Sequence, residues 1–370
     1  MVYQIANLDD IFTSRLLSEI PPSLSSLLTA LLALPSLHTI DLSDNAFGLN
    51  TQAPLVAFLS SHVPLKHLIL NNNGLGPRAG VLVGGALSEL AGKKEEARRK
   101  GENVPDLETL ICGRNRLENG SMSEWAKVYA AHRGVKTVKM ASNGIRQEGI
   151  SHLLREGFRH AKDLRVLDLQ DNTFTILGSK TLSDVVAGWP ELRELGLGDC
   201  ILGARGGVVV AEALGKGTNK ALEVLRLQYN DIDAKCLTAF KNAVKDALPA
   251  LKRIELNGNK FDEEDPSVGV LRELLDVRKK KAGSEDDEAE DGWGLDSLSD
   301  LEEDSDEEDE EDEEDENEDE ADEANVDKDE KEEMAEKLLQ DVGKAEDENV
   351  PLEEDKNVDE LAEKLGKTGL

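Results

Sequence analysis

The sequence predicts an α/β solenoid, in which a parallel sheet lines the inside and helices cover the outside. Two observations carry this prediction: a leucine pattern recurs eight times, and most of its starts are separated by 28 to 30 residues. A third observation shows where the solenoid should end, because the charge of the chain changes abruptly near residue 280.

The recurring pattern is L-x-x-L-x-L-x-x-N-x-L, which is typical of leucine-rich repeats. It starts at residues 37, 65, 107, 135, 164, 192, 222 and 251, for example as LHTIDLSDNAF (37–47) and LKHLILNNNGL (65–75). Each copy supplies a short strand and its turn, and the rest of the period is long enough for a helix that returns along the outside. Repeats of this length predict a ribonuclease-inhibitor-like horseshoe.

Helical spacing of apolar residues supports this reading of the intervals between copies. It is present in AGVLVGGALSELAG (79–92) and in LGSKTLSDVVAGW (177–189). One interval is longer, 42 residues, and it contains the charged segment GKKEEARRKGENV (92–104). We expect this insertion to lengthen a helix or a loop.

Charge divides the chain into two parts. Residues 1–280 hold 34 acidic and 35 basic residues, whereas residues 281–370 hold 43 acidic and 8 basic ones. We therefore expect a leucine-rich repeat domain over 1–280 and a disordered acidic tail over 281–370. Apolar residues with helical spacing in 334–342 and 358–365 predict short amphipathic helices within that tail.

The same composition limits partners and location. A polyanionic tail argues against nucleic acid as a partner and favours basic protein surfaces. The sequence has no apolar run of the roughly 18 residues that a membrane span needs, and no secretory signal at Met1. We therefore expect no membrane association. The three cysteines show no paired spacing, so we expect a reducing intracellular compartment.

The ninth position of the repeat is almost always asparagine, and we expect it to be structural. Its amide can satisfy buried backbone groups of neighbouring turns. The ninth-position residues are Asn45, Asn73, Asn115, Asn143, Asn172, Cys200, Asn230 and Asn259.

The eighth position should face solvent, because the strand ends there. No packing rule requires its residue types, and in a solenoid one position forms a continuous stripe of the kind that binds partners. Ordinary solvated loop residues remain the alternative for any single member. The eighth-position residues are Asp44, Asn72, Arg114, Ser142, Asp171, Asp199, Tyr229 and Gly258.

Residues for chemistry of its own are scarce in this chain. The six histidines show no paired metal-ligand spacing, the cysteines form no CxxC, and no phosphate-binding loop of the GxxxxGK[ST] type is present. The strand residues that face the inside carry mixed charge without aromatic interleaving. We therefore expect a protein-binding surface, with no metal and no cofactor held by this chain.

Several segments are more specific than the repeat requires, and together they resemble the Ran GTPase-activating proteins. The resemblance covers nearly all of residues 8–262 and includes the insertion and the acidic tail. The segments are DIFTSR (10–15), LSDNAFG (42–48), NNNGLGP (71–77), ICGRNRLENGSMSEWAK (111–127), LDLQDNTF (167–174) and LRLQYN (225–230). The chain is most similar to the short, fungal-type members, but it starts within a repeat, so we expect it to be truncated at the N-terminus relative to them.

The resemblance implies that the chain activates GTP hydrolysis by Ran and is itself a regulator, not an enzyme. Ran would hold the GTP and the Mg²⁺, and Ran-binding proteins or transport receptors would be further partners of a monomeric activator. It implies a role in nucleocytoplasmic transport, in the cytoplasm or at the periphery of the nuclear envelope.

The resemblance also implies a mechanism. Members of this family are understood to work without an arginine finger, using a rim asparagine that fixes Ran's own catalytic glutamine. By motif that asparagine is Asn72. Arg15 matches the family's functionally important arginine and is expected to order the rim or bind Ran. Asp44, Arg114, Asp171 and Asp199 are the further Ran contacts that we predict.

A non-catalytic scaffold is the alternative function. Leucine-rich repeats joined to an acidic tail also occur in proteins that bind basic partners such as histones. Binding to histones without any effect on GTP hydrolysis by Ran would favour that class.

Overall fold

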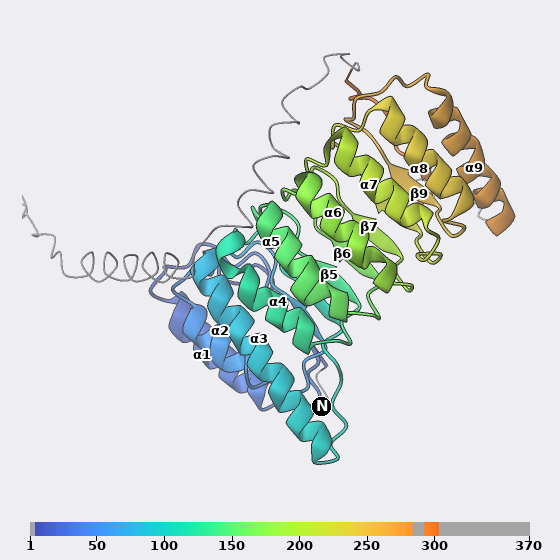
Figure 1. The fold of residues 1–370 in the computed structure, drawn as a ribbon. Coiled ribbons are helices and arrows are strands. Elements are labelled where there is room, and N and C mark those ends of the chain that lie inside the picture. Colours follow the sequence, from blue (N-terminus) through green and yellow to red (C-terminus); the bar gives the residue numbers. More distant parts are fainter. Residues whose placement is uncertain (1–3, 284–291, 303–370) are drawn as a thin grey trace, which may run out of the picture. The chain divides into compact units, whose positions relative to one another are not determined.

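The structure is a computed structural model, and it describes residues 4–283 and 292–302. Within these residues ten short strands form one parallel sheet, in which each strand pairs with the next one along the chain (Figure 1). The strands are β1 (Ile5–Asn7), β2 (Thr39–Asp41), β3 (His67–Ile69), β4 (Thr109–Ile111), β5 (Thr137–Lys139), β6 (Val166–Asp168), β7 (Glu194–Gly196), β8 (Val224–Arg226), β9 (Arg253–Glu255) and β10 (Gly294–Leu295).

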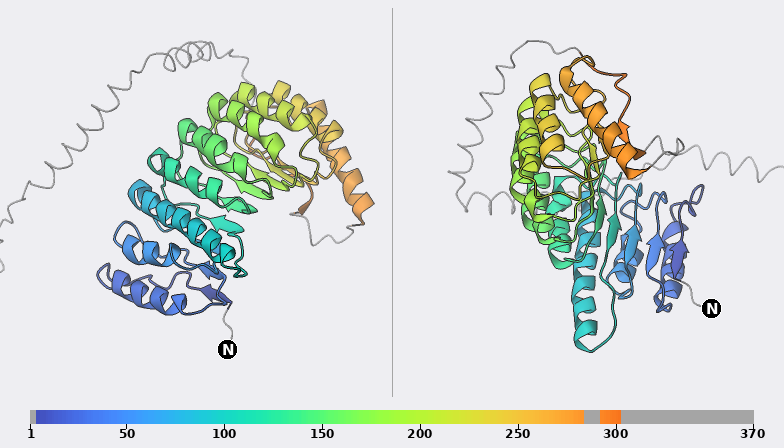
Figure 2. Two further views of the ribbon diagram at one scale, coloured as in Figure 1. Left: turned by 60° about the horizontal axis from the view of Figure 1, so that its bottom comes forward. Right: turned by 90° about the vertical axis from the view of Figure 1, so that its right-hand side faces the viewer.

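Helices connect the strands and lie side by side on the outer face of the sheet (Figure 2). They are α1 (Ile20–Leu32), α2 (Gln52–Leu59), α3 (Gly76–Arg99), α4 (Met122–Ala131), α5 (Gln147–His152), α6 (Thr175–Val185), α7 (Gly203–Gly215), α8 (Ala234–Asp246) and α9 (Pro266–Ala282). The predicted leucine-rich repeat solenoid is confirmed, with the sheet inside and the helices outside. In the described ranges, no helix is both long and apolar enough to cross a bilayer.

The repeating leucines build the core between the sheet and the helices. From β2 to β9, the middle residue of each strand points outward to the helices and is fully buried, as Ile40 and Leu68 are. Its two neighbours in the strand face the inside of the solenoid and are partly exposed in most of these strands. The period of the sequence therefore fixes which side chains the concave face can present.

The ninth-position asparagines form a buried ladder along the end of the strands, as predicted. The Asn73 amide nitrogen donates to the carbonyl oxygens of Leu42 at 3.0 Å, Leu70 at 3.1 Å and Asn71 at 3.1 Å. Its side-chain oxygen accepts from the backbone N–H of Asn45 at 3.1 Å. One side chain thus satisfies four backbone groups of two repeats, which explains why this position tolerates little else.

A second set of polar side chains, buried except for the half-buried Arg278, joins the repeats on the helix side of the core. Each lies near the C-terminal end of a helix and donates to carbonyl oxygens of neighbouring turns. For example, His62 Nε2 donates to Leu37 O at 2.7 Å and Trp189 Nε1 to Phe158 O at 3.0 Å. The residues with this role are His62, Lys94, His132, Trp189, Asn219 and Arg278.

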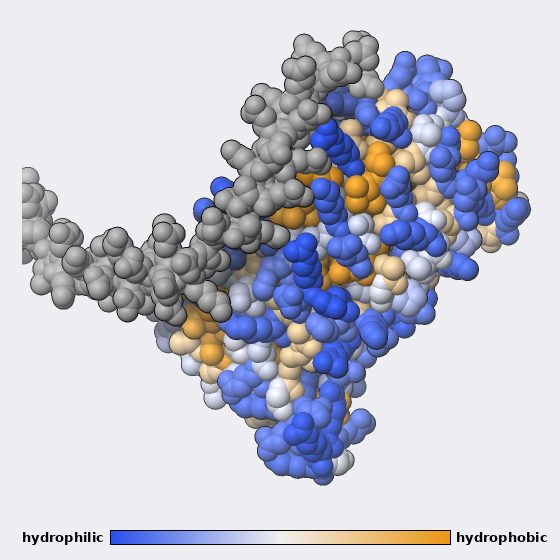
Figure 3. All heavy atoms as spheres, viewed as in Figure 1, coloured by the Kyte–Doolittle hydropathy of each residue, from blue (hydrophilic) through white to orange (hydrophobic). Residues whose placement is uncertain are grey.

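The predicted insertion lengthens α3. Lys94, in this extension, is only 2% exposed, and its ammonium group donates to the carbonyl oxygens of Val63, Leu65 and Pro105 at 2.7, 2.6 and 2.8 Å. These three hydrogen bonds compensate the burial of the charge and tie the returning loop to the helix. The last turns of α3 lie beyond this anchor and end in a hydrophilic protrusion (Figure 3).

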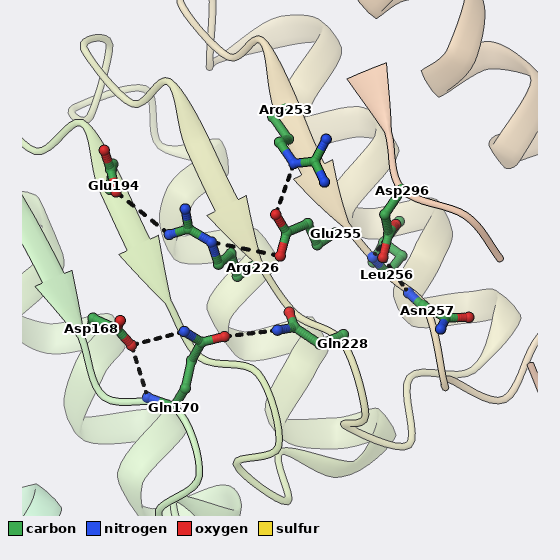
Figure 4. A network of polar contacts seen from close by, with 10 residues as sticks. All are labelled: Asp168, Gln170, Glu194, Arg226, Gln228, Arg253, Glu255, Leu256, Asn257 and Asp296. Carbon is green, nitrogen blue, oxygen red and sulfur yellow. Dashed lines mark hydrogen bonds and ion pairs between the residues drawn. The ribbon is translucent and has the colours of Figure 1, made fainter. Parts of the chain in front are cut away.

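The folded unit extends beyond the predicted domain boundary at residue 280. β10 pairs with β9, and the Asp296 carboxylate accepts the backbone N–H groups of Leu256 at 2.8 Å and Asn257 at 3.0 Å (Figure 4). Apolar residues within the acidic stretch, among them Leu298, pack against the core. The rest of the predicted tail, including its two predicted helices, lies outside the described residues.

Candidate functional site at the strand-end rim

The eighth-position residues share one backbone conformation. Their φ angles lie between 51° and 69°, in the left-handed region that few non-glycine residues adopt. The N–H of nearly every one donates to a carbonyl of the following repeat, as Asn72 does to Gly113 O at 2.9 Å. The side chains are therefore in register, with about 4.8 Å between neighbouring strands. We call this row the strand-end rim: Asp44, Asn72, Arg114, Ser142, Asp171, Asp199, Tyr229 and Gly258.

Three consecutive asparagines at the rim have three different environments. Asn73 is fully buried in the ladder described above. Asn71 faces the concave side, where its side-chain oxygen accepts the backbone N–H of Gly113 at 2.7 Å. Asn72 is exposed on the rim between them. Asn72 is thus the most exposed of the three.

The side chain of Asn72 is hydrogen-bonded to the neighbouring rim residue. Its amide nitrogen donates to a carboxylate oxygen of Asp44 at 2.6 Å. Asparagine tolerates left-handed backbone better than most residues, but Arg114 and Tyr229 occupy the same position with φ of 55°. The backbone therefore does not require asparagine here.

The other predicted rim residues fall into two groups. Arg114 is exposed at the rim position that follows Asn72. Asp171 and Asp199 are adjacent farther along, where they line a shallow hollow of about 230 Å³ together with Ser142 and Ile201. The rim thus presents a mixed group around Asn72 and a pair of carboxylates beyond it.

Arg15 lies apart from the rim. The eighth position of the first repeat is occupied by Asp10, with φ of 53°, and Arg15 follows five residues later in the connection to α1. It is exposed and lines a hollow with Phe12, Glu19 and Leu27. The structure therefore brings five of the six predicted site residues onto one stripe and leaves Arg15 outside it.

Several carboxylates lie close to Asp44, the rim residue that neighbours Asn72. The pKa of Asp9 is raised, mostly by its partial removal from solvent and to a smaller extent by the negative charges of Asp41 and Asp44. The sequence pattern did not identify Asp9, because it precedes the first complete copy of the repeat. This end of the rim is an acidic surface suited to basic groups of a partner.

The concave face near β6 to β9 is occupied by its own polar side chains. Gln170 Nε2 donates to Asp168 at 3.0 Å, and Gln228 Nε2 donates to Gln170 at 2.7 Å across the intervening repeat (Figure 4). Gly198 makes this bridge possible, because a Cβ there would lie 2.5 Å from the Gln228 amide. Arg226 is likewise paired with Glu194 and Glu255.

Groups suited to covalent or metal chemistry are not gathered at the rim. Among the residues that the structure describes, no cluster of three or more His, Cys, Asp or Glu is arranged to hold a metal ion. Burial raises the pKa of the Cys112 thiol to about 12, and it also raises the pKa of Cys200 and Cys236. These thiols remain protonated at neutral pH and are poor nucleophiles.

Comparison with known proteins gives consistent relatives, although no family model matches the chain. The chain is 42% identical to Ran GTPase-activating protein 1 of Saccharomyces cerevisiae over 274 residues, which are 73% of this chain and 66% of the yeast protein. It is 33% identical to the Ran GTPase-activating protein of Drosophila melanogaster over 269 residues, covering 72% of this chain and 44% of that protein. The pig ribonuclease inhibitor is 27% identical over 161 residues, or 44% of this chain and 32% of the inhibitor.

The chain therefore spans about two thirds of the length of the yeast relative and less than half of the fruit-fly one. The aligned part corresponds in length to the repeat unit, which holds the whole strand-end rim.

Proposed function

The chain belongs to the Ran GTPase-activating proteins, and we propose from this that it stimulates GTP hydrolysis by the small GTPase Ran. The proposal is supported by 42% identity to the yeast protein over 73% of the chain. In this proposal Ran holds the nucleotide and its Mg²⁺. The chain regulates an enzyme and does not itself cleave a substrate.

We propose that the activating group is the carboxamide of Asn72. A carboxamide can donate to and accept from the side-chain amide of another residue, so it can hold Ran's catalytic glutamine in the position that aligns the attacking water. Stimulation by GTPase-activating proteins reaches about 10⁵-fold, or about 7 kcal/mol of barrier. The single observation that carries this proposal is the exposed side chain of Asn72 beside two structural asparagines, Asn71 and Asn73.

A mechanism without an inserted arginine fits the arrangement. Arg15 lies off the rim, on the connection between β1 and α1, so its position favours a role in ordering that connection or binding Ran at the edge of the interface. Arg114 follows Asn72 on the rim, where it would contact Ran's surface.

The carboxylates of the rim would provide the attraction for Ran. Asp171 and Asp199 are exposed and adjacent on the rim, and a basic surface of Ran would meet them together. Such attraction raises association rates and weakens as salt is added. We further propose a monomer that works in the cytoplasm or at the nuclear envelope periphery, with Ran-binding proteins or transport receptors as additional partners.

Single-turnover hydrolysis of GTP by Ran tests the proposal. The variant Asn72→Gly removes the carboxamide without straining a residue whose φ is 51°. We expect the maximal rate to fall by about 10² to 10³-fold, the size seen when a positioned hydrogen-bonding group is lost from a transition state. Full stimulation by a correctly folded Asn72→Gly variant would show that the mechanism is wrong.

The alternative of a histone-binding scaffold predicts a different result in the same assay. A scaffold with an acidic tail would bind basic proteins and would leave the rate of GTP hydrolysis by Ran unchanged. Adding the wild-type chain to Ran therefore separates the two functions before any variant is made.

A further inference from the structure

We propose that Asp44 is a positioning residue that sets the orientation of the Asn72 carboxamide, rather than a residue that acts by touching Ran. This inference rests on the proposed function of Asn72. The observation behind it is the 2.6 Å hydrogen bond from Asn72 Nδ2 to Asp44 Oδ1, which joins neighbouring positions of the rim.

The chemistry of the two groups fixes the direction of the contact. A carboxylate accepts hydrogen bonds and has no proton to donate, so only the NH₂ end of the Asn72 amide can face Asp44. The amide oxygen of Asn72 is then turned away from the carboxylate. Rotating the amide by half a turn would bring two oxygens together, and the charge of Asp44 would oppose it.

Asp44 is itself held in place. Its backbone N–H donates to Asn71 O at 3.0 Å, and its φ is 57°. The next residue, Asn45, is locked in the buried ladder by its contact with Asn73. Asp44 is thus a fixed anchor for the Asn72 side chain, although both side chains are exposed.

A fixed orientation matters for activation because Ran's glutamine needs one particular face of the amide. Without Asp44, the Asn72 side chain would sample several rotamers and both amide orientations. Ran would still dock on the rest of the rim, but a smaller fraction of complexes would be aligned for hydrolysis. The loss should therefore appear in the maximal rate and not in the concentration needed for half-saturation.

Two variants of Asp44 separate the hydrogen bond from the backbone. Asp44→Gly removes the side chain and suits the left-handed backbone, whereas Asp44→Asn keeps an acceptor oxygen and also tolerates that backbone. In single-turnover assays with Ran, we expect Asp44→Gly to lower the maximal rate by about 5 to 30-fold, with half-saturation within about twofold. Asp44→Asn should retain the rate within about threefold.

The matched control is Asp231→Gly. Asp231 also has φ of 55° and an exposed carboxylate, but it lies at the far end of the repeats. Asp231 is at the tenth position of its repeat, where its carboxylate pairs with Lys260 at 3.1 Å. Asp231→Gly therefore removes the same charge from a left-handed position far from Asn72, and it should leave the rate unchanged. Thermal unfolding of all variants checks that the frame is intact.

A double-variant cycle decides between positioning and direct contact. If Asp44 acts through Asn72, adding Asp44→Gly to Asn72→Gly should cause no further loss of rate. Independent, multiplicative losses would overturn the inference, as would a raised half-saturation concentration with an unchanged maximal rate. Full activity of Asn72→Gly would overturn the proposed mechanism as well, whereas an inactive Asn72→Gly with a fully active Asp44→Gly would overturn this inference alone.

Discussion

The side-chain oxygen of Asn71 and the backbone N–H of Gly113 lie 2.7 Å apart, directly beside the rim. This hydrogen bond joins the repeat of Asn72 to the next one, and the N–H of Asn72 donates to Gly113 O at 2.9 Å. Asn72 is therefore attached to a backbone that is fixed from both repeats.

Replacing Gly113 by alanine should disturb this junction. A Cβ there would lie 3.2 Å from Asn71 Oδ1 and 3.1 Å from Ala141 O, closer than ordinary contacts. We expect Gly113→Ala to lower the free energy of unfolding by about 1–2 kcal/mol, measured by urea denaturation. Gly85→Ala is the control, because a Cβ at that helical site meets nothing within 4 Å and should be neutral or stabilising. Equal effects of the two substitutions would contradict the close contact.

Replacing Asn73 should lower the stability of the protein without removing its stimulation of GTP hydrolysis by Ran, which we assign to Asn72. Asn73→Ala leaves the buried Asn45 N–H without its acceptor and removes one of two donors from each of three carbonyl oxygens, those of Leu42, Leu70 and Asn71. We expect about 2–4 kcal/mol of destabilisation, since unsatisfied buried groups are unfavourable. Below its unfolding temperature, the remaining folded protein should still stimulate Ran. If Asn73→Ala were as stable as the wild-type protein, water molecules would have to replace the hydrogen bonds of the Asn73 side chain.

His132 should make the protein sensitive to acid. Burial lowers its pKa from 6.5 to about 4, while its Nε2 donates to Leu87 O at 2.8 Å. Between these two values the unfolded chain binds a proton that the folded chain does not, so the free energy of unfolding falls as pH decreases from 6.5 to about 4 and then levels off. The expected loss is roughly 3 kcal/mol.

The variant His132→Gln tests this pH dependence. Glutamine does not titrate, and its amide can still donate to the Leu87 carbonyl. Urea unfolding of both proteins at pH 7, 5.5 and 4 should show a smaller decline for the variant. Parallel declines would assign the acid sensitivity to other groups.

Lys94 should stabilise the extended α3 far more than its neighbour Lys93 does. Lys94→Met leaves the carbonyl oxygens of Val63, Leu65 and Pro105 without their donor. We expect a loss of about 2–3 kcal/mol. Lys93→Met removes only an exposed ion pair with Glu89 and should change stability by less than about 0.5 kcal/mol. Similar melting temperatures for the two variants would refute the anchoring role of Lys94.

Asp296 should hold β10 against the last repeat. Its carboxylate accepts the N–H groups of Leu256 and Asn257, so Asp296→Ala should expose both to solvent. Hydrogen exchange should accelerate at these two amides and remain slow at Leu68, in β3. Unchanged protection at Leu256 would show that β10 is held by its strand pairing and apolar contacts alone.

The repeat template predicted the sheet, the helices, the buried asparagine ladder and the row to which Asn72 belongs. Each of these follows from a residue type that recurs at one position. The polar contacts on the helix side were not predictable, because each repeat uses a different residue as the donor to its backbone carbonyl oxygens, such as His62, Lys94 or Trp189. β10 was missed because its few apolar residues lie within an acidic stretch.

The candidate site was predictable in position but not in geometry. The sequence indicated that Asn72 would be exposed, yet the left-handed backbone and the bond to Asp44 depend on the register of adjacent repeats. The sequence expected Arg15 to order the rim or bind Ran, and in the structure Asp10 holds the eighth position of the first turn while Arg15 lies in the following connection.

The shared left-handed turn separates folding from recognition. Because the main chain makes the turn's contacts between repeats through its own N–H and carbonyl groups, the side chain there contributes little to the frame. Residues as different as Asp44, Arg114 and Tyr229 occupy this column with the same conformation. Single substitutions within the column could alter which partner is bound over the course of evolution, without the compensating changes elsewhere that a buried position would demand.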